Sequence, residues 1–424
     1  MSSHFVFNSC PERFISAVQR NELGVLLKLK VYIDYTECLE ESFALLSKID
    51  CKDVTVVFTR DEDIQKTPEL SCIRSTLVAI AENRNIQILT ILFDGNDFIT
   101  GFNALDVLQT SSLTTLNLSS SWFTYIKNIS CDDVIEREQI LKNHEFYFNN
   151  RTLLTLNILP GNSGYKMGVY AGLIVLNGVA EGENKIDSLS LSYINSSSDN
   201  SELISIFGRK LSNWLASNPK IKYLDVSHNF FKYFCLDCLS NNTNLKTVVA
   251  DNCSIDSMDT LFTYPSLNTT LEKLILSHSN MDRFKQRMLL NLPRGLKYLD
   301  WSYNSSSGWY VLTQTVFDSM AEHLSNLEEL HIQGNRFEYF DIIANFLAET
   351  KTLRKLYVFE KTTYKSFKHN VEKVFENNTS LIFCDYQYLA GLTSNYREVE
   401  NHISKVLERN ARLNVGRRTK AVKR

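Results

Sequence analysis

The feature that most constrains the fold is a short pattern that recurs along almost the whole chain. Apolar residues stand at positions 1, 4 and 6, and an asparagine, a cysteine or a small polar residue stands at position 9. The segment Ile221–Asn229 (IKYLDVSHN) is a full copy, with Leu224 and Val226 at positions 4 and 6. Successive copies begin 24 to 40 residues apart. Each interval can hold one strand, one loop and one helix, so the period indicates a repeat architecture.

Further copies are predicted on both sides of this one. The copy at Ile88 places Ile91 and Phe93 at positions 4 and 6 and Asn96 at position 9. The predicted first positions are Leu26, Cys51, Ile88, Leu113, Leu153, Ile186, Ile221, Leu245, Leu271, Leu296, Leu327, Leu353 and Leu381. One coil cannot bury its apolar side alone, so the coils must stack on one another. The residue at position 9 is expected to hydrogen-bond backbone groups where the chain leaves the strand.

These copies resemble the leucine-rich repeats of the ribonuclease-inhibitor type, and the resemblance covers roughly Leu26 to Tyr386. It implies an α/β fold: a leucine-rich repeat solenoid (horseshoe) with parallel strands on the concave face and helices on the convex face. Apolar residues at helical spacing predict helices over 203–215, 312–324 and 367–375.

We expect four parts along the chain. Residues 1–25 form an N-terminal cap, with a helix around Pro11–Val18. Residues 26–390 are the repeat array, residues 391–415 are a C-terminal capping helix, and residues 416–424 are a basic disordered tail. The tail is either simply solvated, or a nuclear localisation signal or a contact for an anionic surface.

The array departs from regular repeats in two places. Residues 124–151 form an insertion, and six of the 15 glycines fall within Gly161–Gly182. Both are expected to be lengthened loops between coils, which tolerate insertion, and the alternative is a loop that contacts a partner. Within the second place, the apolar stretch Val169–Ala180 is too short to span a membrane and is expected to be a buried helix or strand.

Composition narrows the function classes. A net charge of -3 and a pI near 6.3 argue against a general nucleic-acid binder. The nine cysteines are scattered and suggest no disulfide framework. The first 13 residues lack the basic and apolar segments of a secretory signal. We therefore expect a reducing, cytoplasmic environment and no membrane span.

The candidate binding surface follows from the strand positions that face away from the core. Positions 3, 5 and 7 are expected on the concave face, where the C-terminal copies carry aromatic, acidic and aliphatic residues. Aromatic residues are enriched among binding hot spots, although they also simply favour strands. The candidate partner-binding residues are Tyr223, Asp225, Val249, Lys273, Ile275, Tyr298, Asp300, Glu329, His331, Lys355, Tyr357 and Phe359.

Catalytic, cofactor and metal sites are not predicted. Cys235 and Cys238 form a CxxC, but a zinc site needs four ligands, so a structural role is expected. Cys235 and Asp237 resemble the Cys-x-Asp nucleophile motif of bacterial leucine-rich repeat ubiquitin ligases; there the motif lies in a separate helical domain, so we do not transfer the role. His228 and His278 share position 8 two coils apart, about 10 Å, too far to share a metal. The chain has no glycine-rich phosphate loop and no GxSxG elbow.

The sequence therefore favours a non-enzymatic protein–protein interaction module, monomeric and without a cofactor. Irregular repeat lengths, Asn- and Ser-rich loops and the ending NHISKVLERNARL resemble leucine-rich repeat effectors of intracellular bacterial pathogens. That resemblance implies a virulence function in the host cytosol, where the chain would bind a host protein.

Two alternatives stay open. The first is an endogenous cytosolic adaptor or regulator, like actin regulators or ubiquitin-ligase substrate receptors; residues 1–25 are too short for a full F-box, which counts against a substrate receptor. The second is an enzyme that uses the inserted loops.

Overall fold

In the computed structural model, a strand lies in each of the thirteen predicted copies, and several of the predicted helices are described. The described residues are 4–7, 26–34, 46–59, 70–94, 102–119, 147–160, 168–194, 201–231, 242–255, 270–279, 292–304, 311–337, 341–358, 378–385, 401 and 403–413. The chain forms two compact units. Unit 1 comprises residues 1–214 and 220–230, and unit 2 comprises residues 215–219 and 231–424.

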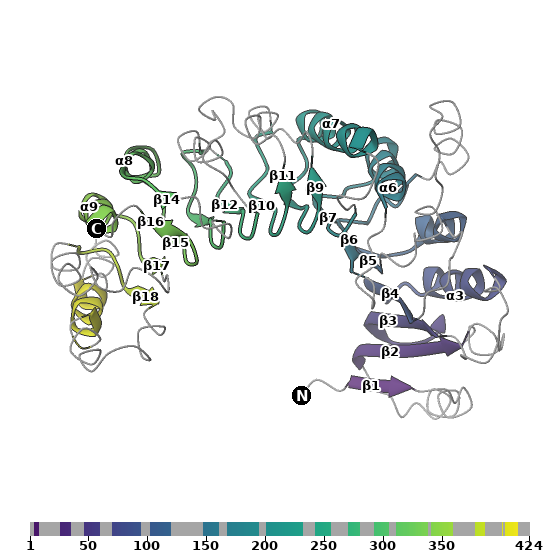
Figure 1. Ribbon diagram of the computed structural model, residues 1–424. Coiled ribbons are helices and arrows are strands. Elements are labelled where there is room, and N and C mark those ends of the chain that lie inside the picture. The colour runs from purple at the N-terminus through teal and green to yellow at the C-terminus, as the bar shows by residue number, and fades with distance from the viewer. Residues whose placement is uncertain are drawn as a thin grey trace. The chain divides into compact units, whose positions relative to one another are not determined.

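Unit 1 is built on parallel strands that follow one another in chain order (Figure 1). Each strand pairs in parallel with the next one in the sequence. The strands are β1 (His4–Phe7), β2 (Leu26–Asp34), β3 (Cys51–Thr59), β4 (Ile88–Asp94), β5 (Thr115–Ser119), β6 (Thr155–Leu159), β7 (Ser188–Leu191) and β8 (Tyr223–Asp225). The helices between them are α3 (Leu70–Glu82), the 3-10 helix η1 (Phe102–Thr110), α6 (Val169–Glu181) and α7 (Ser201–Ser217).

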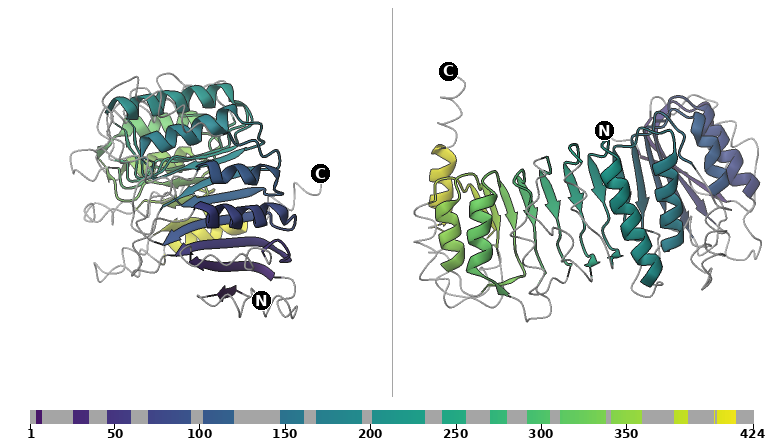
Figure 2. Two further views of the ribbon diagram at one scale, coloured as in Figure 1. Left: turned by 90° about the vertical axis from the view of Figure 1, so that its right-hand side faces the viewer. Right: turned by 90° about the horizontal axis from the view of Figure 1, so that it is seen from above.

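Unit 2 repeats the same arrangement with shorter strands. They also pair in parallel, each with the next in chain order: β10 (Thr247–Val249), β12 (Lys273–Ile275), β13 (Tyr298–Asp300), β15 (Glu329–His331), β17 (Lys355–Tyr357) and β18 (Phe383–Asp385). Unit 2 also contains the two-residue strands β11 (Ser254–Ile255), β14 (Val311–Leu312) and β16 (Arg336–Phe337), and β9 (Phe230–Phe231) lies where the chain passes from unit 1 to unit 2. Helices α8 (Gln314–His323) and α9 (Asp341–Glu349) lie on one side of this sheet (Figures 1 and 2).

Sequential parallel strands joined by helices on one side make each unit a stretch of α/β leucine-rich repeat solenoid, and the predicted fold class is confirmed. The core lies where the pattern placed it. At position 4, Leu224, Leu274, Leu299, Leu330 and Leu356 are all 0% exposed. In unit 2 these leucines lie directly opposite one another on neighbouring strands. Each buried leucine side chain stabilises the fold by roughly 1.5–3 kcal/mol.

Asparagines at position 9 join adjacent coils, as expected. The Asn304 amide donates to the carbonyl of Leu276 in the preceding coil at 2.7 Å and to that of Trp301 in its own coil at 3.2 Å. Its Oδ1 accepts from the backbone N–H of Ser279 at 2.6 Å. Asn335 repeats the pattern one coil later, donating to Trp301 and accepting from Asn304. These side chains satisfy backbone groups that the end of each strand would otherwise leave unpaired inside the core.

The predicted register of the copy at Ile88 is wrong by two residues. Leu89 and Ile91 of β4 pair with Val54 and Val56 of β3, which places Leu89 and Ile91 at positions 4 and 6. Position 1 is therefore Ile86, which is fully buried, while Ile88 is only half-buried at position 3. Both frames put isoleucine or leucine at positions 1 and 4, so the pattern did not separate them. Pairing with β3 decides between them.

The structure also contains a strand that the sequence did not predict. In β1, Phe5 and Phe7 lie opposite Leu29 and Val31 of β2, in the register of positions 4 and 6. This strand falls within the predicted cap 1–25. The helix predicted around Pro11–Val18 lies outside the described residues.

The glycine-rich stretch is a helix rather than the expected loop over the residues that the structure describes. Helix α6 begins after Gly168, whose φ is 92°, and ends before Gly182. A Cβ on Gly172 would lie 2.4 Å from Ile194, so this glycine lets the helix pack closely against its coil. The glycines thus serve close packing, which composition does not distinguish from turn formation. The apolar residues of α6 are buried on nearly every side, so the expectation of a buried helix or strand over Val169–Ala180 is confirmed.

The other helix predictions have mixed outcomes. Helices α7 and α8 confirm the predicted helices at 203–215 and 312–324. The helix predicted at 367–375 and most of the insertion 124–151 lie outside the described residues. Residues 403–413, within the predicted capping segment, are helical, and Ile403 and Val406 are buried there. None of the helices in the described part of the chain is both long and apolar enough to cross a bilayer.

Candidate protein-binding surface

The candidate site is the open face of unit 2, which we define as the strand face carrying positions 3 and 5, away from the core. On β10, β12, β13 and β15 the central residue is buried, and the residues on either side of it are half-buried. Strand alternation produces this pattern, because successive side chains point to opposite faces. The open face therefore presents side chains that are held firmly and still reachable by a partner.

Five side chains from five successive strands form a continuous row on this face, which we call the aromatic row: Lys273, Tyr298, His331, Tyr357 and Phe383. The Lys273 ammonium lies 4.2 Å from the centre of the Tyr298 ring, within range of a cation–π interaction. The ring centres of Tyr298 and His331 are 5.0 Å apart, and those of His331 and Tyr357 are 3.9 Å apart in a stacked arrangement. Tyr357 and Phe383 follow at 5.1 Å.

The carboxylate of Glu329 bonds to one row residue and to a lysine on the next strand. Glu329 accepts a hydrogen bond from His331 Nε2 at 2.8 Å through Oε1, and one from Lys355 Nζ at 2.8 Å through Oε2. An ionised carboxylate only accepts hydrogen bonds, so His331 must carry its proton on Nε2 here. Glu329 therefore fixes the orientation of the imidazole that stacks on Tyr357, and links β15 to β17.

The environment shifts the pKa of one row residue, Tyr298, and of Glu329, which bonds to the row. Burial raises the pKa of the Tyr298 phenol well above its ordinary value, and the nearby Asp300 and Glu329 carboxylates act in the same direction. Tyr298 is therefore a hydrogen-bond donor throughout the physiological range. Burial also raises the pKa of Glu329, but the hydrogen bonds from Lys355 and His331 outweigh it and hold that pKa below its usual range. Glu329 is therefore ionised at neutral pH.

Two of the predicted contact residues are engaged within their own turns. Asp300 Oδ1 accepts from the backbone N–H of Ser302 at 3.0 Å and from its hydroxyl at 2.5 Å. Asp225 holds Ser227 in the same way, at 2.9 and 2.6 Å. The repeated Asp-x-Ser sequence shapes the end of each strand, as short polar side chains commonly do.

The predicted residues do not all fall on one unit. Tyr223 and Asp225 belong to unit 1, and Phe359 lies outside the described residues. The remaining nine lie on the open face of unit 2. Among them, Val249 and Ile275 are half-buried neighbours at position 5 of β10 and β12. The sequence missed Phe383, which ends the row and is 41% exposed. It stands at position 3 of the last copy, so carrying the position-3 assignment one copy further would have found it.

In both units, the residue at position 8 has a left-handed backbone in several copies. Tyr193, His228, Asn252, His278 and Tyr303 all have positive φ between 51° and 61°, and Gly334 follows with φ 71°. The His278 ring stacks on Tyr303 at 4.6 Å, and Asp251 lies 3.2 Å from His278 Nδ1. A Cβ on Gly334 would lie 2.3 Å from the Tyr303 ring. Gly334 therefore provides both the left-handed backbone and the space that this ring needs.

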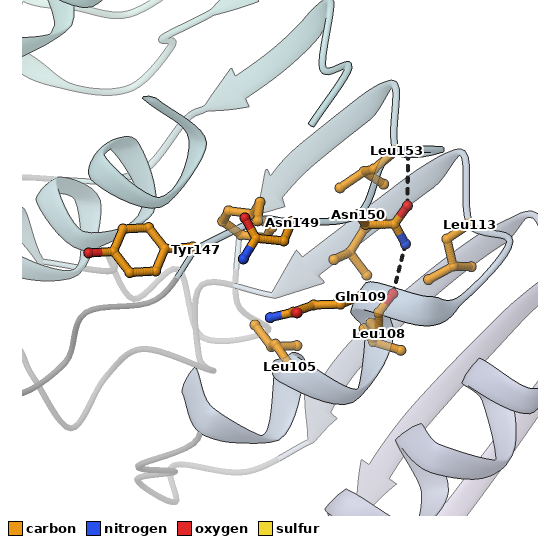
Figure 3. A pocket seen from close by; sticks show the side chains of 10 residues that line it. Leu105, Leu108, Gln109, Leu113, Tyr147, Asn149, Asn150 and Leu153 are labelled. Carbon is orange, nitrogen blue, oxygen red and sulfur yellow. Dashed lines mark hydrogen bonds between the residues drawn. The ribbon is translucent and has the colours of Figure 1, made fainter. Parts of the chain in front are cut away.

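The pocket in Figure 3 is not a ligand site of useful size. It lies where η1, Tyr147–Asn150 and Leu153 meet, and its volume is about 20 Å³. That is room for about one water. The Asn150 amide beside it donates to Leu108 O at 2.7 Å, and its Oδ1 accepts from Leu153 N at 3.1 Å (Figure 3). The pocket is a packing gap lined in part by Tyr147–Asn150, at the end of the predicted insertion.

Candidate metal ligands and thiols are placed only among the residues that the structure describes. No group of three or more His, Cys, Asp or Glu side chains gathers there in a way that could hold a metal ion. Burial raises the pKa of the Cys51 thiol above its ordinary value, which disfavours the reactive thiolate. Cys235, Asp237 and Cys238 lie outside the described residues.

Comparisons with known proteins show similarity in fold only. No protein-family model and no curated protein matches the chain. The chain is similar to TLR13 in a complex with ssRNA13, with a TM-score of 0.41, 14% identity, 85% of this chain covered and 54% of that one. A structure of the yeast Rad7 and Elc1 complex gives a TM-score of 0.44 and 13% identity over 92% of this chain and 82% of that one. LegL7, a leucine-rich repeat-containing protein from Legionella pneumophila, gives 0.37 and 13% over 95% and 98%.

Proposed function

We propose that the chain is a non-enzymatic protein-binding module whose contact surface is the open face of unit 2, centred on the aromatic row. The observation that carries the proposal is the contiguity of Lys273, Tyr298, His331, Tyr357 and Phe383 across five strands. Half-buried aromatic side chains held by their neighbours lose little conformational freedom on binding, and such residues dominate binding energy in protein interfaces.

The test is capture and affinity measurement with three forms of the full chain. Tyr298→Ala/Tyr357→Ala removes the centre of the row. Tyr303→Ala is the matched control, because it truncates an exposed tyrosine at position 8, away from the row. A partner captured by wild type should bind the double variant at least about 30-fold more weakly, which corresponds to about 2 kcal/mol. It should bind the control with nearly wild-type affinity. Unchanged affinity in the double variant, with thermal unfolding also unchanged, would refute this surface.

We further infer that the chain is an effector that binds a host protein in the host cytosol. The support is the sequence resemblance: irregular repeat spacing and Asn- and Ser-rich connecting segments. A translocation reporter fused to the chain separates this from the endogenous adaptor. Reporter signal inside host cells supports the effector, and signal confined to the producing cell supports the adaptor.

A further inference from the structure

The aromatic row has a charged end and an apolar end. At one end Lys273 on β12 lies against the Tyr298 ring, and among the described residues its ammonium makes no ion pair. At the other end Phe383 on β18 is 41% exposed. Between them, both oxygens of Glu329 are taken, one by His331 and one by Lys355. Within the described part of the chain, Lys273 is therefore the charged residue of the row that has no ion-pair partner.

The ring geometry bears on what kind of partner fits. His331 and Tyr357 stack with centres 3.9 Å apart and planes 15° from parallel, so each covers a face of the other. Nucleobases bind proteins by stacking on open aromatic faces, and the centre of the row offers these two faces only to each other. What remains for a partner is ring edges, hydroxyls, the exposed Phe383 ring and the Lys273 ammonium, which suit the carbonyls and side chains of a polypeptide.

The length of the aromatic row sets the spacing between the two partner side chains that can reach its ends. The five strands are consecutive in the sheet of unit 2, so β12 and β18 are about 19 Å apart at the usual spacing of about 4.8 Å. An extended polypeptide advances about 3.3 Å per residue. Two of its side chains that reach the two ends of the row at once are therefore about six residues apart.

Building on the proposed function, we infer that the partner is an extended protein segment that places a carboxylate on Lys273 and a bulky apolar side chain on Phe383, about six residues away. Charge complementarity fixes the first contact, and the exposed ring of Phe383 fixes the second. The segment lies across the strands, over the edges of Tyr298, His331 and Tyr357.

A library of displayed random 12-residue peptides tests this on the full chain. Peptides are selected on wild type and depleted on Tyr298→Ala/Tyr357→Ala, so that only row-dependent binders remain. We expect Asp or Glu about six positions from Phe, Leu, Tyr or Trp. On Lys273→Glu we expect Lys or Arg at the former acidic position, while Phe383→Ser should keep the acidic preference and lose the apolar one. Lys351→Glu, an exposed lysine of unit 2 away from the row, should select the same peptides as wild type.

One selected acidic peptide and its charge-reversed form then give affinities. Lys273→Glu should weaken the acidic peptide about tenfold or more and strengthen the reversed one. Row-dependent peptides with no charge exchange would overturn this inference and leave the proposed function standing. A failure to select any row-dependent peptide would also overturn this inference, and the capture experiment with Tyr298→Ala/Tyr357→Ala would still decide the proposed function separately. Binding of a single-stranded RNA oligonucleotide that the double tyrosine variant loses would assign the row to nucleic acid instead.

Discussion

At the scale of single residues, buried asparagines connect several coils to the coil before them. Besides the position-9 residues, a second set stands three residues before position 1. The Asn83 amide donates to Leu46 O and Ile49 O, both at 2.8 Å, and the Asn378 amide to Leu347 O at 2.7 Å. Leu347 lies in the last turn of α9, where helix carbonyls have no partner within the helix. The side-chain amide of each of these asparagines therefore satisfies backbone carbonyls at the end of the preceding coil.

Replacing Asn304 by alanine tests the position-9 set. The change removes donors to Leu276 O and Trp301 O and the acceptor for Ser279 N, all inside the core. Each buried group left unpaired costs about 1–3 kcal/mol, so urea unfolding should show a loss of at least about 2 kcal/mol. The control is Asn326→Ala, an exposed asparagine with one hydrogen bond, at 3.3 Å to Arg294 O. It should change stability by no more than about 0.5 kcal/mol. If both variants lost the same amount of stability, the hydrogen bonds of Asn304 would contribute no more to stability than the single exposed bond of Asn326.

At the scale of elements, strands are joined by side chains on the open face as well as by the core. Glu329 on β15 accepts hydrogen bonds from His331 on its own strand and from Lys355 on β17. In the helical layer, Phe317 of α8 meets Phe346 of α9 edge to face at 5.4 Å, and both rings are buried. The open face thus has its own electrostatic link between strands, and this link depends on pH.

The pKa of Glu329 gives the sign of that dependence. Its folded-state pKa lies below the ordinary value of 4.5. The link therefore stabilises the fold above the unfolded-state pKa, and this contribution is lost as pH falls through the folded-state pKa. Between about pH 5 and pH 3, wild type should lose more stability than Glu329→Gln, as measured by the melting temperature at each pH. Glu349→Gln, which changes an exposed glutamate at the end of α9, should keep the wild-type slope. Parallel profiles for wild type and Glu329→Gln would contradict this account.

At the scale of the whole molecule, the described strands of the large parallel sheet pair from one coil to the next in both units. A chain of this kind is stabilised by the sum of its coils and of the interfaces between adjacent ones. Damage to one coil should therefore stay local, in contrast to a globular domain with one shared core.

Hydrogen exchange can measure how local the damage is. Leu356→Ala removes a leucine that is 0% exposed at position 4 of β17, which should cost roughly 2–5 kcal/mol. Amides of β15, β17 and β18 should lose protection, while those of β3 and β4 should keep it. Leu89 is also fully buried. Its replacement by alanine should lower protection in β3 and β4 and leave β15, β17 and β18 protected. Loss of protection along the whole chain from either change would show a single cooperative unit.

The sequence by itself determined the repeat and therefore the fold, because the apolar pattern can only be buried by stacking coils. It also placed most of the open-face residues, since alternation assigns each strand position to one side. It did not determine the frame of β4, where two apolar frames fit and only pairing with β3 selects Ile86 over Ile88. Nor did it show that the α6 glycines pack a helix, or that Lys273, Tyr298, His331, Tyr357 and Phe383 form one row. Those properties depend on contacts between residues that are 22 or more positions apart in the sequence, and only the tertiary structure brings such residues together.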